Sequence, residues 1–316
     1  MFNWQDIQIF LEVARTGRLT DAARRLNMDH STVSRRIRRF EADLNTHLFE
    51  RSTHGYRLTT AGNQLRMFAE EMARQATRAH ENISNQNLQL RGQIRIGVTE
   101  GFGTYVITPL LGRFQRRYPE VTVELLALPR AVNLSRHEAD LAITIDRPLN
   151  PDMVVSHLCS YRLRLYGEKT YLATREPPRH LRDLSRFELI GYVDDLLFSN
   201  QLSYLDPLLQ ELPEPPRFTL CSTSVITQMQ AVRAGAGLAV LPCFMAEQDL
   251  SLVPLLTDDI DICREFWIAA RSEQRQLMRV CLLWKFLREA VSHNQDWLMG
   301  ERPGGLRLPG DRDTGF

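Results

Sequence analysis

The sequence predicts a mixed α/β protein in which a small helical domain, a long helix and a larger α/β domain follow one another. Its 316 residues correspond to about two domains at roughly 150 residues each. Apolar side chains recur with helical spacing in the first part of the chain, whereas strands and helices alternate after residue 92. Hydrophobic residues make up 43% and charged residues 24%, which excludes disorder over most of the chain.

Three short helices are predicted at the start of the chain. Apolar residues recur at three- and four-residue steps over Trp4–Thr16, and Gly17 stands where a glycine ends a helix. Thr20 is a suitable N-cap for a second helix, and Asp29 for a third that runs from residue 30 to about 43. The last two helices, separated by a short turn, match the helix-turn-helix plan.

The third helix has two chemically distinct faces. Val33, Ile37, Phe40 and Leu44 cluster on one face, so we expect them in the core. The opposite face and its flanks carry hydroxyl and guanidinium groups, which suit base edges and phosphates of double-stranded DNA. The candidate DNA-binding residues on this helix are Ser31, Thr32, Ser34, Arg35, Arg36, Arg38 and Arg39.

A small hairpin is predicted after the third helix, over residues 47–59, because two short apolar runs flank a turn that contains glycine. Arg51, His54 and Arg57 on this hairpin are further candidate DNA contacts. The formal net charge is only +1, but residues 1–62 hold ten arginines against seven acidic residues. Such a surplus is typical of a phosphate-binding surface, although a solvated helix face has the same composition.

Residues 10–62 resemble the winged helix-turn-helix of LysR-type transcriptional regulators. The residues that carry this resemblance are Gly17, Thr20, Ala22, Ala23, Leu26, Ser34, Ile37, Leu44, Leu48, Phe49, Arg51, Leu58, Thr59, Ala61 and Gly62. That family commonly opens the recognition helix with Ser-Gln-Pro, whereas this chain has Asp29-His30-Ser31. The resemblance therefore implies a DNA-binding domain over residues 1–62 but not an operator preference.

A long helix is predicted over residues 63–91, because residues 63–90 contain neither proline nor glycine. Its apolar residues repeat at alternating steps of four and three, as in a coiled-coil seam. The candidate dimerisation residues are Leu65, Ala69, Met72, Ala76, Ala79, Ile83 and Leu90. The family's linker helix dimerises, so we expect a homodimer and beyond it a homotetramer. A helix packed on its own domain is the alternative.

Residues 92–296 are predicted to form an α/β domain with a parallel, doubly wound sheet. Residues 93–99, 121–125 and 141–145 read as strands, with helices over 103–118 and 132–139, and the alternation continues to residue 241. This region resembles the LysR-type effector domain, which is similar to periplasmic binding proteins: two α/β lobes around a cleft. Residues 297–316 are rich in glycine and proline, and we expect them to be disordered.

The ligand of an open α/β sheet lies beyond the carboxyl ends of its strands. The candidate effector-binding residues are therefore Thr99, Glu100, Gly101, Phe102, Leu128, Pro129, Arg130, Asp146, Arg147, Ser222 and Thr223. Their hydroxyls and amides suit a small anion. Glu100 would repel an acidic ligand unless Arg130 or Arg147 offsets its charge, so a cationic, neutral or amphoteric ligand stays open.

No catalytic or metal-binding pattern emerges. Gly101-Phe102-Gly103 lacks the third glycine of a dinucleotide loop, the histidines are scattered, and the five cysteines include no Cys-x-x-Cys pair. We therefore expect no enzyme, metal or cofactor, but a sequence-specific transcriptional regulator controlled by an unidentified small-molecule effector between the two lobes. The alternatives are a constitutive DNA-binding regulator and an α/β enzyme that acts on nucleic acid.

The expected partners are double-stranded DNA, further copies of the chain and, as an additional candidate, RNA polymerase. No charge-free stretch is long and apolar enough for a membrane span, and the first residues lack the pattern of a secretory signal. We therefore expect a cytoplasmic protein with no membrane contact.

Overall fold

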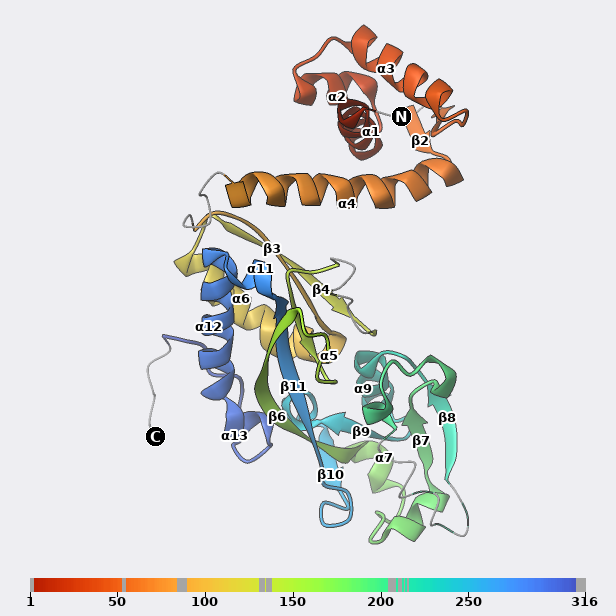
Figure 1. Ribbon diagram of the computed structural model, residues 1–316. Coiled ribbons are helices and arrows are strands. Elements are labelled where there is room, and N and C mark those ends of the chain that lie inside the picture. Colours follow the sequence, from red (N-terminus) through yellow and green to blue (C-terminus); the bar gives the residue numbers. More distant parts are fainter. Residues whose placement is uncertain are drawn as a thin grey trace. The chain divides into compact units, whose positions relative to one another are not determined.

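The chain forms two compact units, Met1–Asn87 and Leu88–Phe316, in the computed structural model (Figure 1). The structure describes residues 3–52, 55–83, 90–130, 134, 138–203, 209, 212, 214 and 216–310. No helix within these ranges is long and apolar enough to cross a membrane.

The first unit contains three short helices, a hairpin and a long helix. Their bounds are α1 Trp4–Thr16, α2 Leu19–Leu26, α3 His30–Asp43, β1 Phe49–Ser52, β2 Gly55–Leu58 and α4 Thr60–Ile83. Gly17 ends α1 with φ of 66°, a left-handed conformation that favours glycine, as predicted. The N-cap of α2 is Arg18 rather than Thr20, because Leu19 is already helical and buries its side chain in the core.

The core of the first unit lies where α1, α3 and the hairpin meet. Val33, Ile37 and Phe40 are almost fully buried, which confirms the predicted inner face of α3. The ring of Phe10 lies 6.3 Å from that of Phe40 and 5.3 Å from that of Phe49. The hairpin is fastened to the turn after α1 by a 2.8 Å hydrogen bond from the amide of Tyr56 to the carbonyl of Gly17.

Helix α4 departs from the predicted dimerisation seam in its first half. Ala69 is fully buried and Leu65 half-buried, and both pack into the unit's own core. Phe68 and Met67 are instead 70% and 69% exposed, and Met72 is 40% exposed. The heptad spacing did not show which partner covers each position, and the core of the first unit covers Ala69. Ala79 and Ile83 have side chains outside the described set, as do residues 84–89 of the predicted helix.

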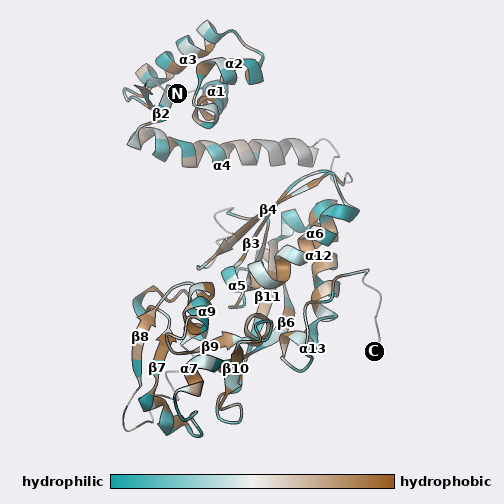
Figure 2. Cartoon of the chain, turned by 180° about the vertical axis from the view of Figure 1, so that it is seen from behind, coloured by the Kyte–Doolittle hydropathy of each residue, from teal (hydrophilic) through white to brown (hydrophobic). Residues whose placement is uncertain are grey.

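The second unit is built on one mixed sheet, to which nine strands contribute in the described part of the chain. The order is β4-β3-β5-β11-β6-β9-β7-β8, with β10 also paired to β6. The strands are β3 Gly92–Thr99, β4 Val121–Leu128, β5 Leu141–Thr144, β6 Met153–Glu168, β7 Glu188–Gly191, β8 Arg217–Cys221, β9 Leu238–Pro242, β10 Leu252–Leu255 and β11 Ile262–Arg271. Figure 2 shows predominantly hydrophobic residues along β3, β4 and β9.

The sheet forms two lobes that are joined by long antiparallel strands. In lobe I, β3 runs parallel to β4 and β5; in lobe II, β7 runs parallel to β8 and β9. Strands β6 and β11 pair antiparallel with each other and run from one lobe to the other (Figure 1). The two-lobed α/β prediction is confirmed, whereas a wholly parallel sheet was wrong because β6 and β11 return between the lobes.

Helices cover both lobes of the second unit. They are α5 Glu100–Phe102, a π-helical turn Gly103–Ile107, α6 Thr108–Arg117, α7 Lys169–Ala173, α9 Val225–Arg233, α10 Cys243–Ala246, α11 Ser272–Arg275, α12 Met278–Ser292 and α13 Gln295–Leu298. Short 3₁₀ turns occupy Leu181–Arg186, Asp194–Leu196 and Asn200–Leu202. The helix predicted over 132–139 falls mostly outside the described residues, and residues 134, 138 and 139 are not helical.

The predicted disorder of residues 297–316 was wrong over most of that segment. Trp297 is 1% exposed, and its indole N–H donates to the carbonyl of Gly304 at 2.9 Å. The buried side chain of Asn294 bonds to both the amide and the carbonyl of Arg307, at 2.8 and 2.9 Å. A few anchors order this segment despite its polar composition. Residues 311–316 lie outside the description.

Candidate nucleic-acid interface and ligand cleft

Helix α3 presents a basic, hydroxyl-bearing surface opposite its buried face. Arg35, Arg38 and Arg39 are exposed, as is Ser31, whereas Thr32 and Ser34 are half-buried. Because the helix is anchored through its apolar face, these side chains have a fixed orientation relative to the core. Guanidinium and hydroxyl groups on one exposed helix face can bond base edges in a major groove and phosphates beside it.

Arg36 is used differently from its neighbours. Its Nη1 lies 3.0 Å from Oδ1 of Asp6 on α1, and the two side chains are 32% and 14% exposed. This ion pair ties α3 to α1. Arg36 was predicted as a phosphate contact on the flank of the helix, but the structure gives it a partner within its own unit.

A surface hollow extends the basic face of α3 toward the hairpin. Ser34 and Arg38 line it together with Tyr56 of β2. Arg18, Thr20 and His30 also line it and are exposed, although the sequence analysis had not selected them as contacts. All three lie at or next to the first turn of α2 or α3. This position near a helix N-terminus is the sequence signal that could have identified them as candidate DNA contacts.

The hairpin forms a wing beside this hollow. Arg57 is exposed on β2 and pairs across the ladder with Glu50 of β1. Directly opposite residues of an antiparallel pair share one face, so the Glu50 carboxylate reduces the positive potential at Arg57. Arg51 belongs to β1, but its side chain and all of His54 lie outside the described set.

A cavity lies between the two lobes of the second unit, beyond the carboxyl ends of β3 and β4. Its interior space is about 50 Å³, room for a few water molecules or one small chemical group. Seven predicted residues line it: Thr99, Glu100, Gly101, Phe102, Leu128, Pro129 and Thr223. Gly101 allows the lobes to approach closely, because a Cβ there would lie 2.8 Å from Val225 Cγ1 on α9.

Four predicted residues have partners outside the cavity lining. Arg130 pairs with Glu138 at 3.0 Å, and the guanidinium of Arg147 lies over the Trp267 ring at 5.2 Å. The other two are fixed by hydrogen bonds. Asp146 accepts from Ser199 and Gln201, and the Ser222 hydroxyl accepts from the amide of Ser224.

Aromatic side chains that the sequence analysis missed form much of the cavity wall. The Phe102 and Phe266 rings stack at 4.0 Å, and the Tyr161 and Phe266 rings at 4.5 Å. Tyr192, Phe198 and Phe244 also line the cavity. Tyr161 and Phe266 lie on β6 and β11, so a rule for parallel strand ends could not select them. The pairing of the two long strands brings them there.

Glu100 is the charged member of this lining. Among the lining residues that the structure describes, no other side chain carries a charge at neutral pH. The Oε2 atom of Glu100 is buried, and no group in the described part of the chain donates a hydrogen bond to it. Burial raises the pKa of the Tyr161 phenol, which keeps that wall residue neutral.

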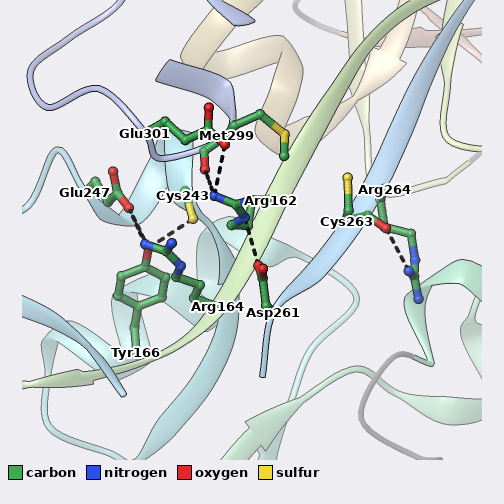
Figure 3. Close-up of polar contacts among 10 residues, drawn as sticks. All are labelled: Arg162, Arg164, Tyr166, Cys243, Glu247, Asp261, Cys263, Arg264, Met299 and Glu301. Carbon is green, nitrogen blue, oxygen red and sulfur yellow. Dashed lines mark hydrogen bonds and ion pairs between the residues drawn. The ribbon is translucent and has the colours of Figure 1, made fainter. Parts of the chain in front are cut away.

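The residues of β6 that alternate with the cavity-lining Tyr161 and Leu163 take part in a network of ion pairs and hydrogen bonds (Figure 3). Arg162 Nε lies 2.8 Å from Asp261 Oδ1, and its Nη1 donates to the carbonyl of Met299 at 2.8 Å. The Tyr166 hydroxyl contacts both Glu247 and Cys243 at 3.3 Å. Burial raises the pKa of the Cys243 thiol to about 11, so this cysteine is neutral and unreactive at physiological pH. The network is structural.

Two family models match the chain and together cover most of it. Residues 4–63 match a model described as "Bacterial regulatory helix-turn-helix protein, lysR family". Residues 87–292, more than half of the chain, match "LysR substrate binding domain".

Individual relatives agree with these matches. The HTH-type transcriptional regulator CrgA of Neisseria meningitidis is 24% identical over 296 residues, covering 92% of this chain and 98% of CrgA. The HTH-type transcriptional activator TtdR of Escherichia coli is 31% identical over 187 residues, covering 59% of this chain and 60% of TtdR. A solved structure of full-length CbnR complexed with its target DNA has a TM-score of 0.64 at 18% identity, with coverage of 91% and 99%, and shows the fold alone.

Proposed function

The chain belongs to the LysR family of transcriptional regulators, and from this premise we propose that a small-molecule effector in the cleft between the lobes controls its binding to specific DNA sites. The family consists of regulators rather than enzymes. The single observation that carries the proposal is the cavity between the lobes, which residues of both lobes of the effector domain line.

In this proposal α3 is the DNA-reading helix. Ser31, Ser34, Arg35 and Arg38 contact base edges, since they share the exposed face of α3 or the hollow beside it. Thr32, Arg39, Arg51, His54 and Arg57 contact the DNA backbone or an adjacent groove. Arg36 holds α3 against α1 through its ion pair with Asp6. Its effect on DNA binding is therefore indirect. The CbnR structure, which holds its target DNA, is a precedent for this fold on DNA.

Effector binding changes the angle between the lobes. The cavity lining includes residues of both lobes, so a ligand that contacts them shifts the population toward one lobe angle. In a homo-oligomer this alters the spacing of paired α3 helices and hence their fit to two half-sites.

Self-association uses the exposed apolar surface of α4. Met67, Phe68 and Met72 are large, exposed hydrophobic residues on this helix, and such a surface favours a second copy as its cover. We propose a homodimer, with pairing of dimers into a homotetramer, and RNA polymerase as a further partner at the promoter. A regulator of chromosomal genes acts in the cytoplasm.

The test joins ligand binding to DNA binding. Binding sites are selected from random DNA, and a metabolite library is screened by thermal shift. We expect at least one compound both to raise the Tm and to change the affinity for the selected site. If no compound stabilises the protein, it is a constitutive regulator. If compounds bind without changing DNA affinity, the cleft does not regulate.

A further inference from the structure

We propose that the effector of this cleft is a small organic cation: an amine whose ammonium group pairs with Glu100 and whose apolar body contacts the apolar and aromatic lining of the cavity. This inference rests on the proposed function, because it assigns a chemical class to the ligand of the same cleft. It also excludes the carboxylate-type ligand that the hydroxyl groups of the site alone would suggest.

The first argument for a cationic ligand is the charge of the residues that line the cavity. Glu100 is the sole charged side chain among the described residues that line it. The two arginines that could have offset its charge are engaged elsewhere: Arg130 contacts Glu138, and Arg147 lies over Trp267. An anionic ligand would thus bring a second negative charge next to Glu100 without a lining cation to pair with, whereas a cation would gain a direct partner.

The second argument is the buried carboxylate oxygen of Glu100. Its Oε2 is removed from solvent, and no donor within the described ranges reaches it. A buried carboxylate oxygen without a donor is costly, so buried polar atoms of folded proteins nearly always have a partner. The N–H groups of a ligand ammonium are donors, and a charge-assisted bond is among the strongest that such an oxygen can accept.

Several backbone amides at the start of α9 are already bonded within the chain. The Ser224 hydroxyl accepts from the amide of Thr227 at 3.1 Å, and the Ser222 hydroxyl accepts from the amide of Ser224 at 3.1 Å. The amide of Ser222 donates to the carbonyl of Gly191 at 3.0 Å. The chain's own groups therefore satisfy the amides of Ser222, Ser224 and Thr227, which lowers the number of donors open to a ligand carboxylate there.

The last argument concerns the body of the ligand and rests on the side chains of the cavity wall. Phe102, Phe266 and Tyr161 form a continuous stack, and Tyr192 and Phe198 add further aromatic surface. The faces of the three stacked rings are largely taken up by one another, and the rings give the wall an apolar character that suits an apolar ligand body. One carboxylate inside an aromatic wall selects an amine with an apolar body.

The experiment compares probes that share a body and differ in charge. Three probes are 2-phenylethylamine, 2-phenylethanol and phenylacetate, and a second set has a cyclohexyl body in place of the phenyl ring. Binding to the full-length protein is measured by calorimetry and thermal shift. We expect the amines to bind at least about tenfold more tightly than the acids, because only the amines pair with the carboxylate.

Variants tie this preference to Glu100. Glu100→Gln keeps the shape of the side chain and should abolish the preference for amines, whereas the matched control Glu120→Gln, on an exposed carboxylate before β4, should retain it. Melting curves without ligand establish that both variants fold. The ranking of the probes on the unaltered protein supplies an independent reading that needs no variant.

Each outcome has one consequence. A preference for amines that Glu100→Gln removes supports the inference. Tighter binding of the acids, or a preference for amines that survives in Glu100→Gln, overturns the assigned charge and leaves the effector cleft itself in place. If neither these probes nor any member of the metabolite library stabilises the protein, the inference and the proposed function both fail.

Discussion

Oδ1 of Asp146 accepts a 2.9 Å hydrogen bond from the hydroxyl of Ser199, and this contact joins the two lobes beside the cleft. Asp146 follows β5 of lobe I, whereas Ser199 precedes the 3₁₀ turn Asn200–Leu202 of lobe II. Gln201 strengthens the bridge, because its Nε2 donates to Asp146 Oδ1 at 3.1 Å and to the carbonyl of Ile145 at 2.9 Å. The neighbouring side chains of Phe198 and Leu202 line the cavity, so a ligand there acts on this bridge.

Removing the bridge should loosen the lobes. Asp146→Ala should lower the free energy of unfolding by about 1 to 2 kcal/mol, since it deletes the acceptor of two hydrogen bonds. Amide hydrogen exchange should increase in residues 199–202. Asp258→Ala, on an exposed turn, is the control and should change neither quantity. Unaltered exchange in Asp146→Ala would show that the bridge does not hold the lobes together.

Helix α4 offers a test of self-association. Phe68→Asp combined with Met72→Asp places charges on the exposed apolar surface and should convert dimers to monomers in sedimentation velocity. Arg66→Asp inserts the same charge on another face of the helix and should leave the dimer intact. A double variant that sediments as the unaltered protein does would remove this surface from the interface.

The C-terminal segment should depend on one amide side chain. Asn294→Ala deletes the two hydrogen bonds to the backbone of Arg307, so we expect a loss of about 1 to 2 kcal/mol in urea unfolding. Trypsin should then cleave faster after Arg307. The exposed neighbour Ser292→Ala serves as the control. Equal cleavage rates in the two variants would contradict the anchoring role of Asn294.

Alkylation of the folded protein should modify exposed cysteines and leave buried ones unmodified. Cys221 and Cys263 are exposed and should react with iodoacetamide in the folded protein. Cys243 is buried, and its pKa is raised to about 11, so it keeps its proton and stays unmodified from pH 7 to pH 9. Mass spectrometry of tryptic peptides distinguishes the sites. Modification of Cys243 in the folded protein below pH 9 would contradict its assigned environment.

Local signals predicted the first unit better than the second. The end of α1 at Gly17 and the buried face of α3 follow from backbone freedom and helical spacing, both of which are local. Thr20 was a sound cap by composition, but the tertiary requirement to bury Leu19 moved the start of α2 forward. The same limit explains Ala69, whose spacing fits a coiled coil although its side chain packs into the core of its own unit.

The effector cleft was predictable only where parallel strands end. Thr99 ends β3 and Glu100 to Phe102 follow it, while Leu128 and Pro129 lie at the end of β4, so the rule for open sheets found them. Tyr161 and Phe266 reach the cavity because β6 and β11 pair over a long antiparallel register that no local pattern encodes. Arg130 also follows β4, as the rule requires, but it forms an ion pair with Glu138 and does not line the cavity.

Sequence-specific reading of DNA by α3 is the central claim, and Arg35→Ala tests it most directly. Affinities for a selected site and for random DNA are measured at several salt concentrations, with Arg39→Ala as the matched control. We expect Arg35→Ala to lose roughly 10- to 100-fold on the selected site with little change on random DNA, and Arg39→Ala to weaken both about equally and to lower the salt slope. An equal loss on both DNAs for Arg35→Ala would contradict the assigned orientation of α3.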